Sequence, residues 1–325
     1  MTPMKCLVSA CWMGLATFGL VSTSQAQTYP SQDIHFICAF PAGGGADALV
    51  RYFAEKVRPL TGRNIIVENR PGASGNIAIE YVARSKPDGH TILVHGGSTI
   101  AANVHLFKRP PFPEPGKAIQ VAATINRQPF MAMVDAKSPY KTLADLTAAM
   151  KAKGDKASYG ATATTGTVMG ELYKVATGIT AVEVLYKSAP DTVNDMLSGV
   201  LDYSMQDPVF ALAQHRQDRM RILGVSTGRR LAAIPELPTM TEQGVPMDLT
   251  AWWAAMVPAA TPSPVVAQIN KWFVQIVSSD ETKKFLAGVG GDSLVETPEV
   301  AQKRLLDDVA KWGEYIRIAK IQPQG

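Results

Sequence analysis

Short apolar runs alternate with amphipathic segments along the chain from residue 33 onward. The runs at 33–40, 64–69 and 90–96 have the length and apolar content of buried strands. The segments between them, 47–60 and 76–84, place apolar residues on one helical face. A strand, helix, strand, helix, strand order with short loops predicts a parallel sheet covered by helices.

A second series of the same kind begins at about residue 141, after a proline-rich stretch at 108–117. The remaining apolar runs predict strands at 118–125, 129–136, 157–162, 182–187, 202–207, 221–227 and 249–258, and the periodic segments predict helices at 141–153, 166–178, 190–200 and 299–321. The two series share one layout, which predicts two α/β lobes. Two lobes imply a cleft between them, and such clefts are favoured ligand sites.

The first 26 residues have the layout of a secretory signal peptide. Lys5 and the amino terminus supply positive charge, 6–21 is mostly apolar, and the small residues at 24–26 predict cleavage after Ala26. The apolar run is short for a membrane span. The segment VSAC resembles a lipoprotein cleavage box, but most of the apolar region follows Cys11 instead of preceding it. We therefore expect a soluble exported protein.

The net charge and the cysteine content argue against nucleic-acid binding and against a disulfide in the mature chain. The formal net charge is +4 at pH 7, and the longest basic cluster is Arg229-Arg230, so we expect no nucleic-acid binding. Of the 3 cysteines, only Cys38 remains after removal of the signal peptide. It lies in a predicted buried strand, where cysteine behaves as a small hydrophobe; a nucleophilic thiol is the alternative.

The segment FPAGGGAD at 40–47 follows the first predicted strand. Ligands of open α/β sheets lie at the carboxyl ends of strands, glycines allow close approach, and the next helix start favours anions. Asp47 could cap that helix or hold the loop in shape. Ala48 stands where the dinucleotide fingerprint needs a third glycine, and the Gly-Lys-Ser/Thr ending of a phosphate-binding loop is missing. The glycines therefore indicate a ligand other than a nucleotide; a tight turn without a ligand is the alternative.

Two more predicted strand ends carry neutral donors. The segment HGGSTIAANV at 95–104 contains Ser98 and Thr99, and YGATATTGTVMGEL at 159–172 is rich in threonine and glycine. Hydroxyls and exposed amides can hold a carboxylate without carrying charge. Three such loops at equivalent positions in two lobes favour a reversible carboxylate site.

A search for catalytic groups gives little. The 5 histidines show no metal-ligand spacing, and no G-x-S-x-G motif occurs. We expect no catalytic residue, no metal and no cofactor, and we interpret His95, Trp252 and Trp253 as structural or as lining the cleft. The enzyme alternative is a secreted hydrolase using Ser98, which lacks a recognisable nucleophile context.

Several blocks, taken together and in this order, resemble one known family. They are FPAGGGAD, VENRPGASGNIA, VARSKPDGHTIL, LYKSAPDTVNDMLSGVLDY, RRLAAIPELPTMTEQGVP and WWAAMVPAATPSPVVAQIN. They resemble the periplasmic solute-binding proteins of tripartite tricarboxylate transporters, the Bug or TctC-like family. The resemblance implies a two-lobed class II (Venus-flytrap) fold with a hinge and an interlobe cleft. The first lobe would hold 27–128 and 251–325, and the second 129–250.

The resemblance also implies a function and a set of site residues. The ligand would be a small organic carboxylate (a dicarboxylate, tricarboxylate, acidic amino acid or aromatic acid), delivered by a monomeric periplasmic receptor to the membrane subunits of the transporter. The residues implied as ligand-binding are Phe40, Ala42, Gly43, Gly44, Asp47, Ser98, Thr99, Thr162, Thr164, Thr165, Gly166 and Asp207. The second-lobe loop departs from many relatives, since it is about two residues shorter, threonine-rich and without histidine. The carbon skeleton of the ligand therefore stays open, as does a sensor-adaptor function that passes the ligand signal to a regulator.

Overall fold

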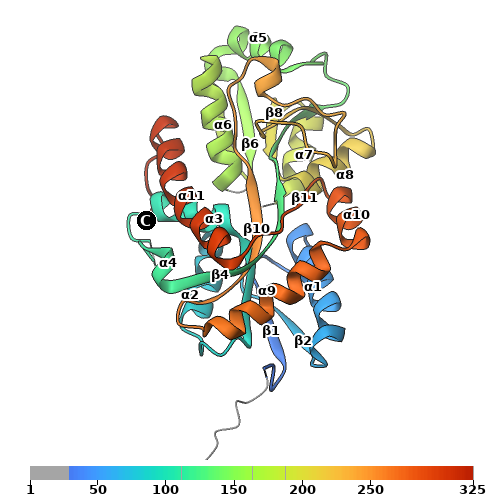
Figure 1. Ribbon diagram of the computed structural model, residues 1–325. Coiled ribbons are helices and arrows are strands. Elements are labelled where there is room, and N and C mark those ends of the chain that lie inside the picture. Colours follow the sequence, from blue (N-terminus) through green and yellow to red (C-terminus); the bar gives the residue numbers. More distant parts are fainter. Residues whose placement is uncertain (1–28, 111, 163, 187, 325) are drawn as a thin grey trace, which may run out of the picture.

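The computed structural model describes residues 29–110, 112–162, 164–186 and 188–324. The predicted signal peptide and its cleavage site lie outside the described residues. Two sheets, one toward each end of the molecule, are flanked by helices (Figure 1). Within these ranges no helix is both long and apolar enough to cross a bilayer.

The first lobe is built on a six-stranded sheet in the order β11-β4-β10-β3-β1-β2. Its strands are β1 Ile34–Cys38, β2 Ile65–Asn69, β3 Thr91–Gly96, β4 Ile119–Gln128, β10 Ala251–Pro258 and β11 Asp292–Ser293. β1 pairs in parallel with β2 and β3, which confirms the parallel arrangement predicted for the first three strands. β10 runs antiparallel to both β3 and β4, so the complete sheet is mixed.

Alternating residues of β1 separate the two faces of this sheet. Phe36 and Cys38 lie in one buried cluster with Phe53 and Phe273, whereas Ile37 belongs to the cluster on the other face. The helices of this lobe are α1 Gly45–Thr61, α2 Asn76–Ala83, α3 Gly97–Leu106, α4 Pro115–Ala118, α9 Ser263–Val277, α10 Asp280–Gly288 and α11 Pro298–Ile318. Cys38 is a free, fully buried thiol, as its place in an apolar strand predicts.

The second lobe is built on a five-stranded sheet in the order β7-β6-β8-β5-β9. Its elements are β5 Met131–Asp135, α5 Leu143–Lys153, β6 Ser158–Ala161, α6 Thr164–Thr177, β7 Val182–Leu185, α7 Ala189–Leu197, β8 Tyr203–Gln206, α8 Pro208–Arg216 and β9 Met220–Val225. β6 is parallel to β7 and β8, and β5 is antiparallel to β8 and β9. One buried cluster continues from the first lobe into this one.

Three helix starts differ from the sequence prediction. α3 begins at Gly97 and α8 at Pro208, although neither segment was predicted to be helical, and α6 begins at Thr164 instead of Gly166. Glycines and threonines have low helix propensity, which hides the first turns of α3 and α6. The start of α8 carries a recognisable signal, since Asp207 is the N-cap and Pro208 the first helical residue.

The chain passes between the sheets twice, after β4 and before β10, and Ser226 joins the two passages. Its backbone N–H donates to the carbonyl of Phe130 at 2.9 Å, and the Phe130 N–H donates to the Ser226 hydroxyl oxygen at 2.9 Å. The same hydroxyl donates to the Leu249 carbonyl at 2.5 Å, and the Leu249 N–H donates to the Ser226 carbonyl at 2.8 Å. This fully buried serine therefore fixes the spacing of the two connecting segments.

Candidate ligand site between the two sheets

The three consecutive glycines after β1 have three different surroundings. Gly43 has a φ of +83°, a left-handed conformation that side chains rarely adopt. A Cβ added at Gly44 would meet only the Pro41 carbonyl oxygen, at 3.8 Å, so a ligand group has room to approach there. A Cβ at Gly45 would lie 2.9 Å from Cγ1 of Val209, in the second lobe. Gly43 therefore allows a left-handed backbone conformation, Gly44 leaves open space, and Gly45 allows contact between the lobes.

The Asp47 side chain holds this loop in place through hydrogen bonds. Its Oδ2 accepts hydrogen bonds from the Gly43 N–H at 2.9 Å and from Arg51 Nε at 2.8 Å, and its Oδ1 accepts from Asn69 Nδ2 at 2.8 Å. Asn69 also donates to the Phe40 carbonyl at 3.0 Å. Asp47 is 3% exposed and lies in the first turn of α1, so it supports the loop instead of occupying the N-cap position.

The electrostatics of the first loop favour an anion. Burial raises the pKa of Asp47, but hydrogen bonds from Arg51, the Gly43 amide and Asn69 outweigh burial and hold the pKa at about 2. The carboxylate is thus charged, and its charge is balanced by Arg51. The N-cap of α1 is Gly44, which offers no side-chain cap, so the first N–H groups of this 17-residue helix face the site without one.

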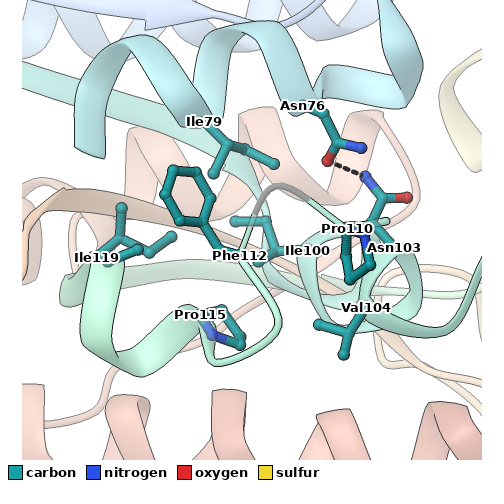
Figure 2. Close-up of a pocket in the computed structure, with 10 residues that line it drawn as sticks. Asn76, Ile79, Ile100, Asn103, Val104, Pro110, Phe112, Pro115 and Ile119 are labelled. Carbon is teal, nitrogen blue, oxygen red and sulfur yellow. Dashed lines mark hydrogen bonds between the residues drawn. The ribbon is translucent and has the colours of Figure 1, made fainter. Parts of the chain in front are cut away.

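Ser98 and Thr99 lie in the first turn of α3, which also begins after a glycine N-cap. Asn103, one turn further on, donates from Nδ2 to Asn76 Oδ1 at 2.9 Å (Figure 2). It also donates to the Ser74 carbonyl, at 2.9 Å. These bonds join α3 to the start of α2 and thereby fix the orientation of the first turn. Ser98 is only 1% exposed.

His95, the next-to-last residue of β3, packs beneath the glycine loop. Its ring centroid lies 5.4 Å from that of Phe40 and 5.9 Å from that of Trp253, and burial lowers its pKa to about 4. His95 is therefore neutral at pH 7. Phe40 is half-buried against these two rings, whereas Ala42 is exposed. The structure thus agrees with a packing role for His95 and Trp253.

The second lobe contributes hydroxyl groups that are held by fewer hydrogen bonds than Asp47. Thr162 Oγ1 donates to Gln206 Oε1 at 3.2 Å, and the Gln206 amide donates to Thr192 and Ser204. Thr164 and Thr165 are in the first turn of α6, and Thr165 is buried. Gly166 is buried too. A Cβ added there would lie 2.8 Å from the Met205 carbonyl oxygen, so a side chain does not fit at this position.

Asp207 lies at the end of β8 and caps α8. Its Oδ1 accepts a hydrogen bond from the Phe210 N–H at 3.1 Å. Burial raises the pKa of this carboxyl, and the backbone N–H groups that donate to it oppose the rise. The start of α8 is therefore already occupied by a carboxylate of the protein, unlike the starts of α1 and α3.

The structure brings the predicted loops together in two places. The starts of α1 and α8 meet through Gly45 and Val209, and α3 packs against α6 (Figure 1). Four loops at the carboxyl ends of β1, β3, β6 and β8 therefore converge between the sheets. Sequence reasoning missed Arg51, Asn69, Gln206 and Val209. The spacing of Asp47 and Arg51, four residues apart on one helix, is a signal that could have indicated the first of them.

Two hollows of the first lobe lie elsewhere. One, with a volume of about 10 Å³, is bounded by Ile79, Ile100, Asn103 and Phe112 among others, and holds at most about one water molecule (Figure 2). The other has a volume of about 510 Å³ and is lined by residues such as Pro87, Phe112 and Pro258. The predicted ligand residues line neither hollow.

Groups for metal binding or nucleophilic catalysis are not assembled in the described part of the chain. No cluster of three or more His, Cys, Asp or Glu side chains there could hold a metal ion. The Ser98 hydroxyl and both ring nitrogens of His95 are buried without a hydrogen-bond partner among the same residues. A serine–histidine pair of the kind that a hydrolase needs is therefore not formed by these two side chains.

Comparisons with known proteins confirm the resemblance seen in the sequence. The family described as "Tripartite tricarboxylate transporter family receptor" matches residues 49–321. The chain is similar to Protein BugT of Bordetella pertussis, with 26% identity over 307 residues that cover 93% of this chain and 94% of the relative.

Solved structures show the same two-lobed fold. The chain is similar to "R. palustris Rpa4515 with adipate", with a TM-score of 0.84, 26% identity, and coverage of 91% of this chain and 100% of that one. It is also similar to the periplasmic binding protein BugD, with a TM-score of 0.80, 26% identity, and coverage of 91% and 100%. The chain belongs to the tripartite tricarboxylate transporter family of receptors.

Proposed function

We propose that this chain is a periplasmic receptor that captures a small organic carboxylate between its two lobes and delivers it to the membrane subunits of a tripartite tricarboxylate transporter. It would act as a monomer after export by its predicted signal peptide. The lobes would be 27–128 with 251–325, and 129–250, and the segments joined by Ser226 would form the hinge. The observation that carries the proposal is the uncapped start of α1 behind an open glycine loop.

A ligand carboxylate would occupy the place of the missing side-chain cap. The first N–H groups of α1 carry the positive end of the helix dipole, and open space beside Gly44 lets an oxygen reach them. Asp47 keeps the loop in this conformation before any ligand arrives, which lowers the entropy cost of binding. The anionic end of the ligand would therefore bind the first lobe.

The second lobe would hold the rest of the ligand. Its candidate contacts are the hydroxyls of Thr162 and Thr165 and the backbone at Gly166, which donate hydrogen bonds without adding charge. The full proposed contact set is Phe40, Ala42, Gly43, Gly44, Ser98, Thr99, Thr162, Thr164, Thr165, Gly166 and, nearby, the two carboxylates Asp47 and Asp207. A dicarboxylate is supported by the relative with adipate, which shares 26% of its residues with this chain.

The chain would bind its ligand without transforming it. The family is one of receptors, and Ser98 makes no hydrogen bond to His95 in the structure. A hydrolase with Ser98 as nucleophile is therefore disfavoured. Turnover of a chromogenic ester that disappeared in Ser98→Ala would contradict this.

Thermal unfolding with added acids tests the receptor function. The mature chain would be unfolded and refolded to remove bound ligand, then heated with succinate, adipate, citrate, glutamate or benzoate. An acid at about a hundred times its dissociation constant adds roughly 2.7 kcal/mol to the unfolding free energy, which is a clear midpoint shift. One class of acid should shift the midpoint. If no acid on this panel did, the carboxylate assignment would be wrong.

A matched pair of variants locates the site. Gly44→Leu should abolish the shift, because its side chain fills the space where the carboxylate would approach. Gly288→Leu is the control, because a Cβ at Gly288 meets nothing within 4 Å and α10 lies outside the proposed contact set. The variant keeps the Gly288 carbonyl, which accepts a hydrogen bond from Arg216 of the second lobe. Equal shifts in both variants would place the carboxylate elsewhere.

A further inference from the structure

The two lobes touch where α1 and α8 begin. A Cβ built at Gly45 would lie 2.9 Å from Cγ1, 3.2 Å from Cβ and 3.6 Å from Cγ2 of Val209. Carbon atoms in ordinary contact are about 3.5–4.0 Å apart, so no side chain fits at Gly45 in this arrangement. We infer that Gly45 and Val209 form the contact at which the closing lobes stop, and that Val209 is the positioning residue that sets the width of the closed site. This inference rests on the proposed receptor function.

Neither side of the contact can move aside easily. Val209 follows Pro208, whose ring fixes its backbone angle, and Asp207 caps the same helical turn through the Phe210 N–H. The branched valine side chain has one strongly preferred rotamer in a helix. On the opposite side, Gly45 begins α1 directly after the loop that Asp47 holds. Two rigid helix starts therefore meet, and extra volume between them must separate the lobes.

The two lobes also pack against each other elsewhere. On the side of α8, a Cβ added at Gly290 of the first lobe would lie 2.9 Å from Cβ of Pro208 and 2.6 Å from Cδ1 of Leu212. α6 packs against α3 and α11, which Figure 1 shows on the left, whereas α1 and α8 lie on the right. An added side chain at Gly45 would therefore tilt the start of α8 away from α1, while α6 keeps its contacts with α3 and α11. Such a tilt would move the hydroxyls of the second lobe away from the start of α1.

Substitutions at the neighbouring residues Gly44 and Gly45 should weaken binding for different reasons. Gly44 faces open space, so an added side chain there would affect a bound ligand directly. Gly45 faces Val209, so an added methyl group would affect the distance between lobes. Gly44→Ala and Gly45→Ala are thus matched substitutions, one residue apart, whose effects have different causes.

The test is a double-mutant cycle with two readouts. Affinity would be measured by calorimetry for the acid of the panel that shifts the wild-type midpoint most. The interlobe distance would be measured, with and without that acid, between spin labels on Glu55→Cys in α1 and Lys151→Cys in α5, since Cys38 is buried. The variants are Gly45→Ala, Val209→Ala, their combination, Gly44→Ala, and Gly44→Ala with Val209→Ala.

We expect Gly45→Ala to weaken binding about tenfold and to lengthen the shortest interlobe distance. Val209→Ala should recover most of both effects, though not all, because its Cβ remains 3.2 Å from the added methyl group. Gly44→Ala should weaken binding with no recovery by Val209→Ala. Lack of recovery in the Gly45→Ala background would overturn the inference. If wild-type protein bound none of the acids, the receptor function would fail, and the ligand-free distances would still decide whether this contact limits closure.

Discussion

The two lobes present helix starts of opposite electrostatic character to the space between them. In the first lobe, the start of α1 has no side-chain cap, and the nearby carboxylate of Asp47 is turned inward and balanced by Arg51. In the second lobe, the start of α8 is capped by Asp207, whose pKa is raised by burial. The same secondary-structure feature therefore attracts an anion on one side and already contains one on the other.

The loops also differ in how firmly they are held. Three donors from α1, β2 and the loop itself converge on Asp47, whereas the Thr162 hydroxyl makes one hydrogen bond to the residues that the structure describes, namely to Gln206. A preorganised loop suits the group that all carboxylates share, and a less constrained loop suits the part that varies among them. This difference indicates that the first lobe determines the charge of the ligand and the second its shape.

Replacing Asp47 should have the largest effect. Asp47→Ala removes the acceptor for three hydrogen bonds: the Gly43 N–H loses its partner, and the Asn69 amide keeps only its bond to the Phe40 carbonyl. We expect the unfolding free energy to fall by about 3 kcal/mol and carboxylate affinity to fall more than tenfold. Urea unfolding and calorimetry would measure the two effects.

The control for that variant is Asp207→Ala, which removes one hydrogen bond and one helix cap in the other lobe. A lost cap costs about 1 kcal/mol, so this variant should be clearly less damaged. Equal losses of stability in the two variants would contradict the idea that the first loop is held more firmly.

The sequence predicted most of the strands because each is a compact apolar run, and β10, buried along its whole length, is the clearest case. It also placed the glycine loop and both hydroxyl-bearing segments directly after strands, because the strands before them could be recognised from the sequence. The sequence did not predict α3, and it placed the start of α6 at Gly166 instead of Thr164, because packing against neighbouring elements overrides the low helix propensity of their first residues.

Contacts between distant residues could not be predicted in the same way. Asn69 and Asp47 are 22 residues apart, and Gly45 and Val209 lie in different lobes, so only the fold brings them together. The glycine run illustrates the limit. The sequence linked the glycine run to the approach of a ligand, with a tight turn as the alternative, whereas only the structure shows the positive φ of Gly43 and the contact of Gly45 with Val209.

The pH dependence of stability is a second way to compare Asp47 of the first lobe with Asp207 of the second. The folded pKa of Asp47 is about 2 and its ordinary value is 3.8, so its contribution is complete above about pH 4 and is lost as the pH falls toward 2. That contribution is roughly 2 kcal/mol, since one pKa unit corresponds to about 1.4 kcal/mol. In urea unfolding from pH 6 to pH 2, the stability difference between wild type and Asp47→Asn should shrink by this amount. A difference independent of pH would mean that the Asp47 charge is not stabilised by its donors.

Asp207→Asn should show the smallest effect and the opposite sign. A carboxyl with a raised folded pKa disfavours folding at pH values above that pKa, and this penalty disappears as the pH falls through the raised value toward 3.8. Asparagine caps helices as well as aspartate, so the variant keeps the cap and removes the charge. We expect stability at pH 7 equal to wild type or higher by less than about 1 kcal/mol, and carboxylate affinity about threefold tighter because a repulsive charge is gone. Weaker binding in calorimetry would show instead that Asp207 accepts a hydrogen bond from the ligand, and the ligand would then carry a donor group opposite its carboxylate.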